Sequence, residues 1–157
     1  MTSRRIIELD HRDHEFASRI QRVLFSAYSE EARLINIERF PPLERTASDI
    51  AMSENHFLGI VARQDLVGVV ELESKEGLDD HLGIASLGVD PQYARQGIGL
   101  ALIDHVIRFR APLVTVSTAS VNAPAIALYE KVGFQVVKSD TNRHGIPIVH
   151  LEKRVAE

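Results

Sequence analysis

The sequence predicts an α/β protein of the mixed α+β kind, built on a single sheet, and three observations carry this prediction. Two β-rich runs, 57–62 and 66–72, flank the short polar segment 63–65, which is the pattern of an antiparallel hairpin. Later β-rich runs alternate with amphipathic helical patterns, which is typical of strand-helix-strand units. No repeat or linker-like stretch divides the chain. The predicted order is β-α-(α)-β-β-β-α-β-α-β-β.

The first part of the chain predicts one strand and two helices. Residues 4–9 form a short β-rich run, after which Asp10 or Asp13 caps a helix. The apolar residues of this helix recur at helical spacing: Phe16, Ile20, Val23, Leu24 and Ala27. The segment 40–42 carries two prolines and interrupts regular structure, and a shorter helix is expected at 46–53.

The middle of the chain predicts a strand that leads into a helix. The run 82–89 follows the polar stretch 74–80, and Pro91 stops the strand. An amphipathic helix then ends near Arg110, with Pro112 just beyond it. Its core-facing residues are Ile98, Leu102, Val106 and Phe109.

The last part predicts a strand, a helix and two further strands. Residues 113–117 alternate Leu, Val, Thr, Val and Ser, which is the pattern of a buried strand. Asn122 is the expected N-cap of a helix that runs to Val132 and stops at Gly133. Two strands, 134–137 and 146–151, complete the order, and the polar loop 139–145 joins them.

Length and composition predict one soluble globular domain over residues 1–157, because 45% of the residues are apolar and 25% are charged. No apolar run approaches the roughly 18 residues of a membrane helix, and charged residues near the start disfavour a secretory segment. We therefore expect a cytoplasmic protein without a membrane partner. The absence of cysteine excludes disulfides, thiolate catalysis and cysteine zinc sites. The net charge of −4 argues against nucleic acid as a partner.

One turn between a strand end and a helix start has the features of an anion site. Its residues are Arg95, Gln96, Gly97, Ile98, Gly99 and Leu100. Free N–H groups and the positive end of the helix dipole converge at such a position. Gly97 and Gly99 would let a pyrophosphate approach the backbone, and Arg95 adds a positive charge. An ordinary strand-to-helix turn is the alternative interpretation.

The turn matches neither of two common nucleotide-binding patterns. Leu102 stands where a third Rossmann glycine would fall, and no Gly-Lys-Ser/Thr follows the glycines. An ATP-binding protein is therefore disfavoured.

A second group of residues lies on the helix 122–132. Asn122 and Tyr129 are seven residues apart, which places them about two turns along one helix face, where both can contact one ligand. The alternative is that Asn122 only caps the helix and Tyr129 is a core aromatic.

Three blocks taken together resemble the GNAT superfamily of acetyl-CoA-dependent N-acetyltransferases. The blocks are Leu87-Gly88-Val89-Asp90-Pro91, then 93–102, then Asn122, Ala125, Leu128-Tyr129-Glu130-Lys131 and Gly133-Phe134. Their order and spacing match the family over about 68–137. One departure is Ala94, where the family's phosphate motif prefers Gln or Arg. Since the contacts expected there come mostly from the backbone, the change is compatible with coenzyme binding.

The resemblance implies a GNAT-like fold, a mostly antiparallel twisted sheet flanked by about four helices, and acetyl-CoA as co-substrate without a metal. It implies that the strand carrying Leu87, Gly88 and Val89 splays from its neighbour and holds the pantetheine arm. The Val89 N–H would stabilise the oxyanion. The turn 95–100 would hold the pyrophosphate, and Asn122 would also bind the coenzyme.

By the same resemblance, an acetyl group passes to a primary amine by direct attack in a ternary complex, with Tyr129 as the general acid. The base is open. Glu71 and Glu73 share a strand face, with Ser86 and His81 on the next strand, so either carboxylate can serve; a solvated sheet face is the alternative. The histidines show no metal-ligand spacing.

The acceptor is expected to be a small-molecule amine or a peptide amine, selected by the segments 25–42 and 139–145. A different class of function is a catalytically silent acyl-CoA sensor or partner-binding module. Tyr129 favours the enzyme. We leave open whether the chain forms a homodimer.

Overall fold

The computed structural model describes residues 5–74, 81–109 and 111–154. Its elements are β1 (Arg5–Glu8), α1 (His14–Leu34), η1 (Pro41–Glu44), α2 (Ala47–Ala51), β2 (His56–Ala62), β3 (Asp65–Ser74), β4 (His81–Val89), η2 (Pro91–Tyr93), α3 (Ile98–Phe109), β5 (Leu113–Ala119), α4 (Ala123–Lys131), β6 (Gln135–Thr141) and β7 (Pro147–Arg154). This order of helices and strands confirms the predicted one.

The strands of the described residues form one seven-stranded sheet in the order β1-β2-β3-β4-β5-β7-β6. Every neighbouring pair is antiparallel except β4 and β5, which are parallel. A parallel pair needs a crossover, and α3 lies on the connection between these two strands. The mixed, mostly antiparallel sheet is therefore confirmed.

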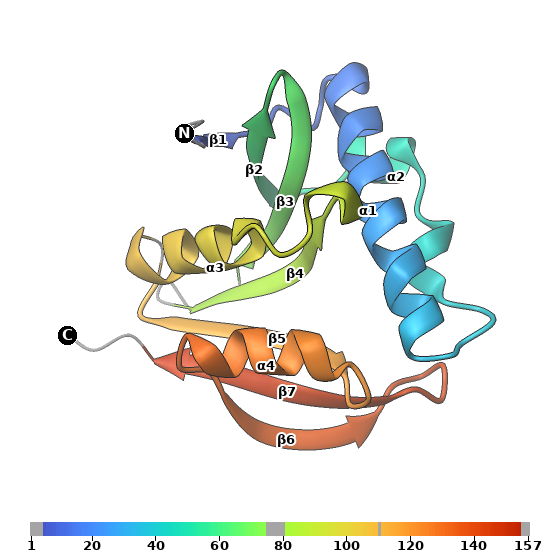
Figure 1. The fold of residues 1–157 in the computed structure, drawn as a ribbon, viewed down its shortest axis with the longest axis vertical. Helices are drawn as coiled ribbons and strands as arrows, with labels where there is room; N and C mark the ends of the chain where they lie inside the picture. Colours follow the sequence, from blue (N-terminus) through green and yellow to red (C-terminus); the bar gives the residue numbers. More distant parts are fainter. Residues whose placement is uncertain (1–4, 75–80, 110, 155–157) are drawn as a thin grey trace.

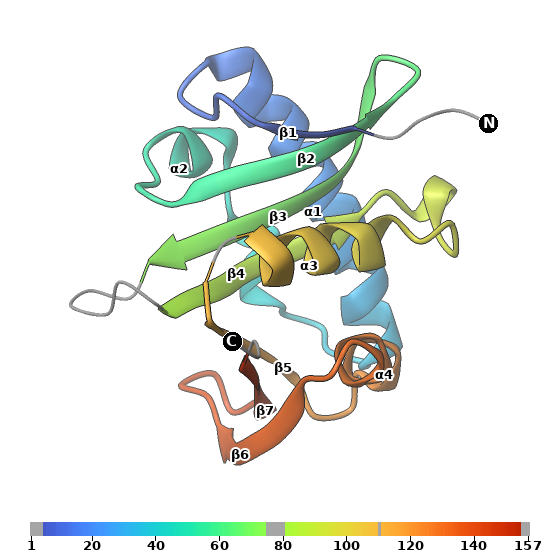
Figure 2. The ribbon, with the colours of Figure 1, turned by 90° about the vertical axis from the view of Figure 1, so that its left-hand side faces the viewer.

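Helices cover both faces of the sheet (Figures 1 and 2). One core contains residues of α1 and α2 against β2 and β3: Ala17, Ile20, Val23, Leu24, Ile50, Phe57, Leu66 and Val69. The other core packs α3 and α4 against the opposite face, with Leu102, Ile103, Val106, Tyr129 and Phe134 among its residues. We call these two sides of the sheet the α1 face and the α3/α4 face.

Both helices of the first part begin at the residues that the caps indicate. The Asp13 carboxylate accepts a hydrogen bond from the Glu15 N–H, so Asp13 and not Asp10 is the N-cap of α1. Thr46 and Asp49 form a capping box at the start of α2, which ends at Ala51, within the predicted 46–53.

The predicted hairpin between β2 and β3 is confirmed, with Ala62 paired to Asp65. Its two turn residues, Arg63 and Gln64, have φ values of 52° and 73°. Two consecutive residues with positive φ match the right-handed twist of the strands in a two-residue hairpin.

The prediction of a polar loop over 139–145 was wrong for residues 139–141. Ser139, Asp140 and Thr141 belong to β6, where they pair with β7. Every residue of β6 is exposed, so this edge strand has no alternation of buried and exposed residues that would distinguish it from a loop. Residues 75–80 of the predicted polar stretch and Arg110 lie outside the described residues.

No helix in the described ranges has both the length and the apolar character that crossing a membrane requires.

Candidate functional site

The sheet opens into a fork between its two parallel strands. β4 pairs with β5 only from His81 to Ile84, and the last pair is Ile84 with Val116. Next to this pair, the register of β3 and β4 shifts so that Ala85 is an extra residue in β4. The predicted splaying of this strand is therefore confirmed, and Leu87, Gly88 and Val89 lie on it beyond the last pair. On the side that faces β5, the peptide groups of this segment have no sheet partner.

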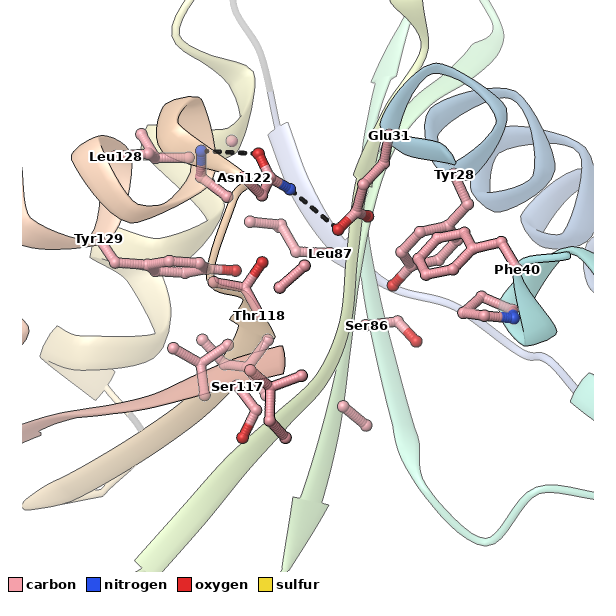
Figure 3. Close-up of a pocket in the computed structure, with 18 of the residues that line it drawn as sticks. Tyr28, Glu31, Phe40, Ser86, Leu87, Ser117, Thr118, Asn122, Leu128 and Tyr129 are labelled. Atoms are coloured by element: carbon pink, nitrogen blue, oxygen red, sulfur yellow. Dashed lines mark hydrogen bonds between the residues drawn. The ribbon is translucent and has the colours of Figure 1, made fainter. Parts of the chain in front are cut away.

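A cavity of about 410 Å³ fills the fork. Figure 3 shows its two sides, with α4 and β5 on one and α1 with Phe40 on the other. Residues from both faces of the sheet line it. Gly99 and Leu128 belong to the α3/α4 face, while Phe40 and Pro42 lie beside α1. The cavity therefore passes between the two arms of the sheet and can admit one ligand from each face.

The turn before α3 presents free N–H groups next to this cavity. The first intrahelical bond runs from the Ala101 N–H to the Gly97 carbonyl, which leaves the N–H groups of residues 98–100 without an acceptor in the helix. Arg95 and Gly97 both have left-handed φ, 63° and 78°, so the backbone folds back sharply here. The turn has the local geometry of an anion site.

The structure separates the residues predicted for the coenzyme into groups. Gly99, Leu87, Val89 and Asn122 line the cavity, as Tyr129 does. Other members of the turn, Arg95, Gln96 and Gly97, are exposed, and Leu100 is half-buried.

The two remaining residues predicted for the coenzyme are turned away from the cavity. The Ile98 side chain is buried in the core, so only its backbone is available to a ligand. Gly88 lies under α1, since a Cβ there would stand 3.0 Å from Leu24 Cδ2 and 3.1 Å from Ala27 Cβ. Its role in the structure is the close approach of α1 to β4.

Asn122 caps α4, as predicted, and it also lines the cavity, while its contact with a coenzyme stays a prediction. Its Oδ1 accepts the Ala125 N–H at 3.3 Å, which caps α4. Its Nδ2 donates to Glu31 Oε1 at 2.9 Å, across the cavity (Figure 3). The side chain is buried and lines the cavity.

Tyr129 is a core residue, as one of the two interpretations predicted, and it also lines the cavity, so its contact with a ligand stays a prediction. Its ring packs edge-to-face against Phe134, with centroids 5.4 Å apart. Burial raises the pKa of the Tyr129 phenol, and the nearby Tyr28 and Glu31 raise it further. The phenol therefore keeps its proton at neutral pH.

Two cavity residues on α1, Tyr28 and Glu31, lie in the segment 25–42 that was expected to select the acceptor, but neither was predicted as a catalytic or coenzyme-binding residue. Burial raises the pKa of Tyr28 to about 12, although hydrogen bonds with the Ser86 hydroxyl and the Leu87 backbone oppose the rise. Burial also raises the pKa of Glu31, against the hydrogen bond from Asn122. Their spacing of three residues on a helix that packs on the sheet was the available signal.

Glu71 is a buried carboxylate that accepts four hydrogen bonds. Arg45 donates from both guanidinium nitrogens, at 2.7 and 2.9 Å, and Asn55 Nδ2 donates at 2.9 Å. The fourth donor is the Ser86 hydroxyl at 2.7 Å. Burial would raise the pKa of Glu71, but these donors outweigh it and hold the pKa below its usual range.

The other candidates for the base lie apart from this group. Glu73 is opposite Gly83, and its side chain is exposed. The His81 ring is hydrogen-bonded to Thr115 Oγ1 on β5 at 3.0 Å. Ser86 therefore contacts Glu71, as expected, whereas His81 is bonded to β5. The role of Glu71 or Glu73 as a base stays a prediction.

A second cavity, of about 350 Å³, adjoins the first on the α1 face. The two share Tyr28, Pro42, Ala85 and Ser86 in their walls. Leu24 and Phe25 of α1 and Ile50 of α2 line the second cavity, together with the Arg45–Glu71 pair. The described residues contain no group of three or more histidine or carboxylate side chains arranged to hold a metal ion.

Comparison with known proteins identifies relatives of this chain. The profile of the Acetyltransferase (GNAT) domain matches residues 24–155. The UPF0157 protein YqkA of Bacillus subtilis is 33% identical over 140 residues, which are 88% of this chain and 40% of that protein. The N-alpha-acetyltransferase RimI of Mycobacterium tuberculosis is 34% identical over 92 residues, 57% of this chain and 58% of that protein. The chain thus spans 40% to 58% of the length of these relatives.

A solved structure shares the fold over nearly the whole chain. The PaiA N-acetyltransferase of Thermoplasma acidophilum, in complex with coenzyme A, superposes with a TM-score of 0.78 at 19% identity. The match covers 98% of this chain and 99% of that one.

Proposed function

This chain belongs to the GNAT family of acetyltransferases, and we propose that it transfers an acetyl group from acetyl-CoA to a primary amine of an acceptor. The observation that carries the proposal is a single cavity that brings together the open edge of β4, the start of α3 and Tyr129. An acyl transfer needs a held donor, a stabilised oxyanion and a proton for the leaving group. The cavity walls contain a group suited to each.

The donor is proposed to enter from the α3/α4 face. Its pyrophosphate would lie on the free N–H groups of residues 98–100, with Gly97 and Gly99 allowing close approach and Arg95 adding a positive charge. The pantetheine arm would take the place that β5 vacates and bond to the open edge of β4 between Leu87 and Val89. Asn122 would contact the arm from the start of α4.

The acceptor amine is proposed to attack the thioester directly, in a ternary complex. The Val89 N–H is the proposed donor to the developing oxyanion. Tyr129 is the proposed general acid, since its buried phenol keeps its proton until the C–S bond breaks and the thiolate forms.

Proton removal from the amine through Glu71 would have to pass through the Ser86 hydroxyl. All four of the hydrogen bonds that the Glu71 carboxylate accepts come from protein groups, and Ser86 is the one donor among them that also lines the main cavity. The conservative variant Glu71→Gln removes this carboxylate, so its acetylation rate distinguishes the route through Glu71 from routes that do not use it.

The acceptor class is proposed to include peptide amines. The relative RimI is named an N-alpha-acetyltransferase, so a free peptide α-amine is the first candidate. The wall on the α1 face combines the apolar Phe40, Ile146 and Ile148 with the carboxylate of Glu31. Such a mixture suits an amine carried on a partly apolar chain.

The test is acetyl-CoA turnover, followed as release of coenzyme thiol, against a panel of amines. The panel holds peptides with free α-amines, peptides with free lysine amines, polyamines and aminoglycosides. Amine-dependent release on at least one class supports the proposal. Tight acetyl-CoA binding without release on any amine would instead support the acyl-CoA sensor.

A further inference from the structure

Three side chains on adjacent strands β5, β7 and β6 form one continuous hydrogen-bonded chain. Ser117 Oγ lies 2.7 Å from His150 Nδ1, and His150 Nε2 lies 3.0 Å from Asp140 Oδ1. Ser117 and His150 are direct cross-strand partners, and Asp140 is diagonal to His150 because it pairs with Ile148.

The direction of the two hydrogen bonds that join Ser117, His150 and Asp140 follows from the chemistry of these groups. An ionised carboxylate only accepts hydrogen bonds, so His150 Nε2 carries the proton and donates it to Asp140. Nδ1 of the neutral ring is then the basic nitrogen, and the Ser117 hydroxyl donates to it. The lone pair of the imidazole is thus directed at the serine. The hydrogen bond from His150 is the largest of the contacts that hold the pKa of Asp140 below its usual value, despite some burial.

Ser117, at one end of these three hydrogen-bonded side chains, reaches the cavity. Ser117 is the first residue of β5 after the last pair with β4, and it lines the cavity in the fork. Figure 3 shows Thr118 beside Tyr129 and Ser117 directed to the other side of β5. That side is the α1 face, because the next residue on it, Ala119, packs with Ala32 and Phe40. Ser117 therefore lies on the side from which the acceptor is proposed to enter.

We infer that Ser117, His150 and Asp140 form a proton relay that takes a proton from the acceptor's ammonium group. This inference rests on the proposed acetyl transfer. The ammonium N–H passes its proton to Ser117 Oγ while the Ser117 O–H passes its proton to His150 Nδ1. The neutral amine then forms the N–C bond and the C–S bond breaks. The thiolate takes a proton from the Tyr129 phenol, and the new amide nitrogen gives its remaining extra proton back to the Tyr129 phenolate, so the products are one amide and one thiol.

The charged groups around His150, and its exposure, allow the relay to release its proton after each cycle. The charged groups that face His150 are Asp140 and Lys138 on β6 and Glu152 on its own strand, while β5 contributes only the neutral Ser117 and Thr115. The Lys138 ammonium lies 3.3 Å from Asp140 Oδ2, and so contacts the carboxylate rather than the ring. His150 and Asp140 are each about a third exposed (32% and 37%), so the imidazolium can return its proton to water after each cycle.

The test compares pH profiles of kcat/KM for the wild type and His150→Gln, with an amine that the wild type acetylates. Loss of a general base lowers the rate by about 100-fold or more near pH 7. The deficit should close as pH rises, because an amine that is already neutral needs no base. Ser117→Ala should behave in the same way and Asp140→Asn more mildly, while acetyl-CoA affinity is retained in all three.

The control variant is His56→Gln, which removes an exposed histidine at the start of β2. A deficit in His150→Gln that is equal at every pH would indicate a structural role and overturn the relay. So would kcat/KM values for His150→Gln and Ser117→Ala within twofold of the wild type across the range. Absence of acetylation by the wild type itself overturns the proposed function instead, and the two failures are therefore distinguishable.

Discussion

The amide of Asn122 reaches across the cavity and donates a 2.9 Å hydrogen bond to the carboxylate of Glu31 (Figure 3). Asn122 begins α4 and Glu31 lies on α1, so this contact joins the two sides of the fork. Other links across the fork are made by β4 and β5 themselves, up to Ile84 and Val116. A half-buried carboxylate at this place has a consequence for stability.

Glu31→Gln is expected to raise the midpoint of thermal unfolding at pH 7. The folded protein raises the pKa of Glu31, so it favours the protonated form. The resulting stabilisation is complete below the carboxyl's unfolded pKa and is lost as pH rises through the folded value. A neutral glutamine keeps an oxygen for Asn122 without the half-buried charge.

The gain should therefore vanish in acid, where Glu31 is protonated in both states. Glu30→Gln is the matched control, because Glu30 forms an exposed ion pair with Arg33 on the same helix. Calorimetric scans of both variants at pH 7 and pH 4 measure the effect. Equal midpoints for Glu31→Gln and the wild type at pH 7 would contradict the account.

Arg45→Met is expected to destabilise the protein by about 3–5 kcal/mol at neutral pH, because it leaves the buried Glu71 carboxylate without its cation. The folded pKa of Glu71 is lowered, so the pair stabilises the protein above the ordinary carboxyl pKa, and this contribution fades as pH falls. Denaturant unfolding measures the loss.

Two further variants make this prediction specific. Adding Glu71→Gln to Arg45→Met should recover much of the stability, because no buried charge remains. Arg39→Met removes an exposed ion pair with Glu44 and should change little. A loss in Arg45→Met that does not depend on pH, or no recovery in the double variant, would argue against a buried ion pair.

Gly99→Asp is expected to weaken acetyl-CoA binding by roughly 100-fold or more, because like charges brought together cost several kcal/mol. A carboxylate in the first turn of a helix favours the helix, so the fold should remain. Gly99→Ala is the matched control, since its Cβ would make ordinary contacts at 3.4 Å with Leu128 and 3.6 Å with Val89. Calorimetric titration that gave unchanged affinity for Gly99→Asp would remove the turn from the coenzyme site.

Tyr129→Phe is expected to lower kcat by about 100-fold or more while acetyl-CoA affinity stays nearly unchanged. The phenylalanine ring retains the edge-to-face packing on Phe134 and loses only the hydroxyl. Because the pKa of Tyr129 is raised, the wild type should show no loss of rate from its ionisation below about pH 10. A full rate in Tyr129→Phe would assign the acid role to another group or to water.

Local signals in the sequence predicted the order of the elements and, in the cavity wall, singled out Gly99, Asn122 and Tyr129. Asn122 and Gly133 delimit α4 through cap preferences, and Gly97 with Gly99 identified the turn before α3. These features depend on neighbouring residues, so they can be inferred without the fold. The assignment of the turn to a coenzyme needed the resemblance to a family.

The rest of the cavity depends on contacts between distant residues. Glu31 meets Asn122 across 91 positions, and Ser117 meets His150 across 33. Strand order and register decide such contacts, and a shift of one residue would place His150 on the opposite face. His150 stands between the buried Val149 and Leu151, which indicated its face but not its partner.

The most direct test of the proposed acetyl transfer is the stoichiometry of its products. Purified protein is given acetyl-CoA and the amine that performs best in the panel, and the coenzyme thiol and acetylated amine are quantified together over time. The account predicts one amide formed for each thiol released, with Gly99→Asp inactive. Thiol release without acetylated amine, or coenzyme binding with neither product, would contradict it.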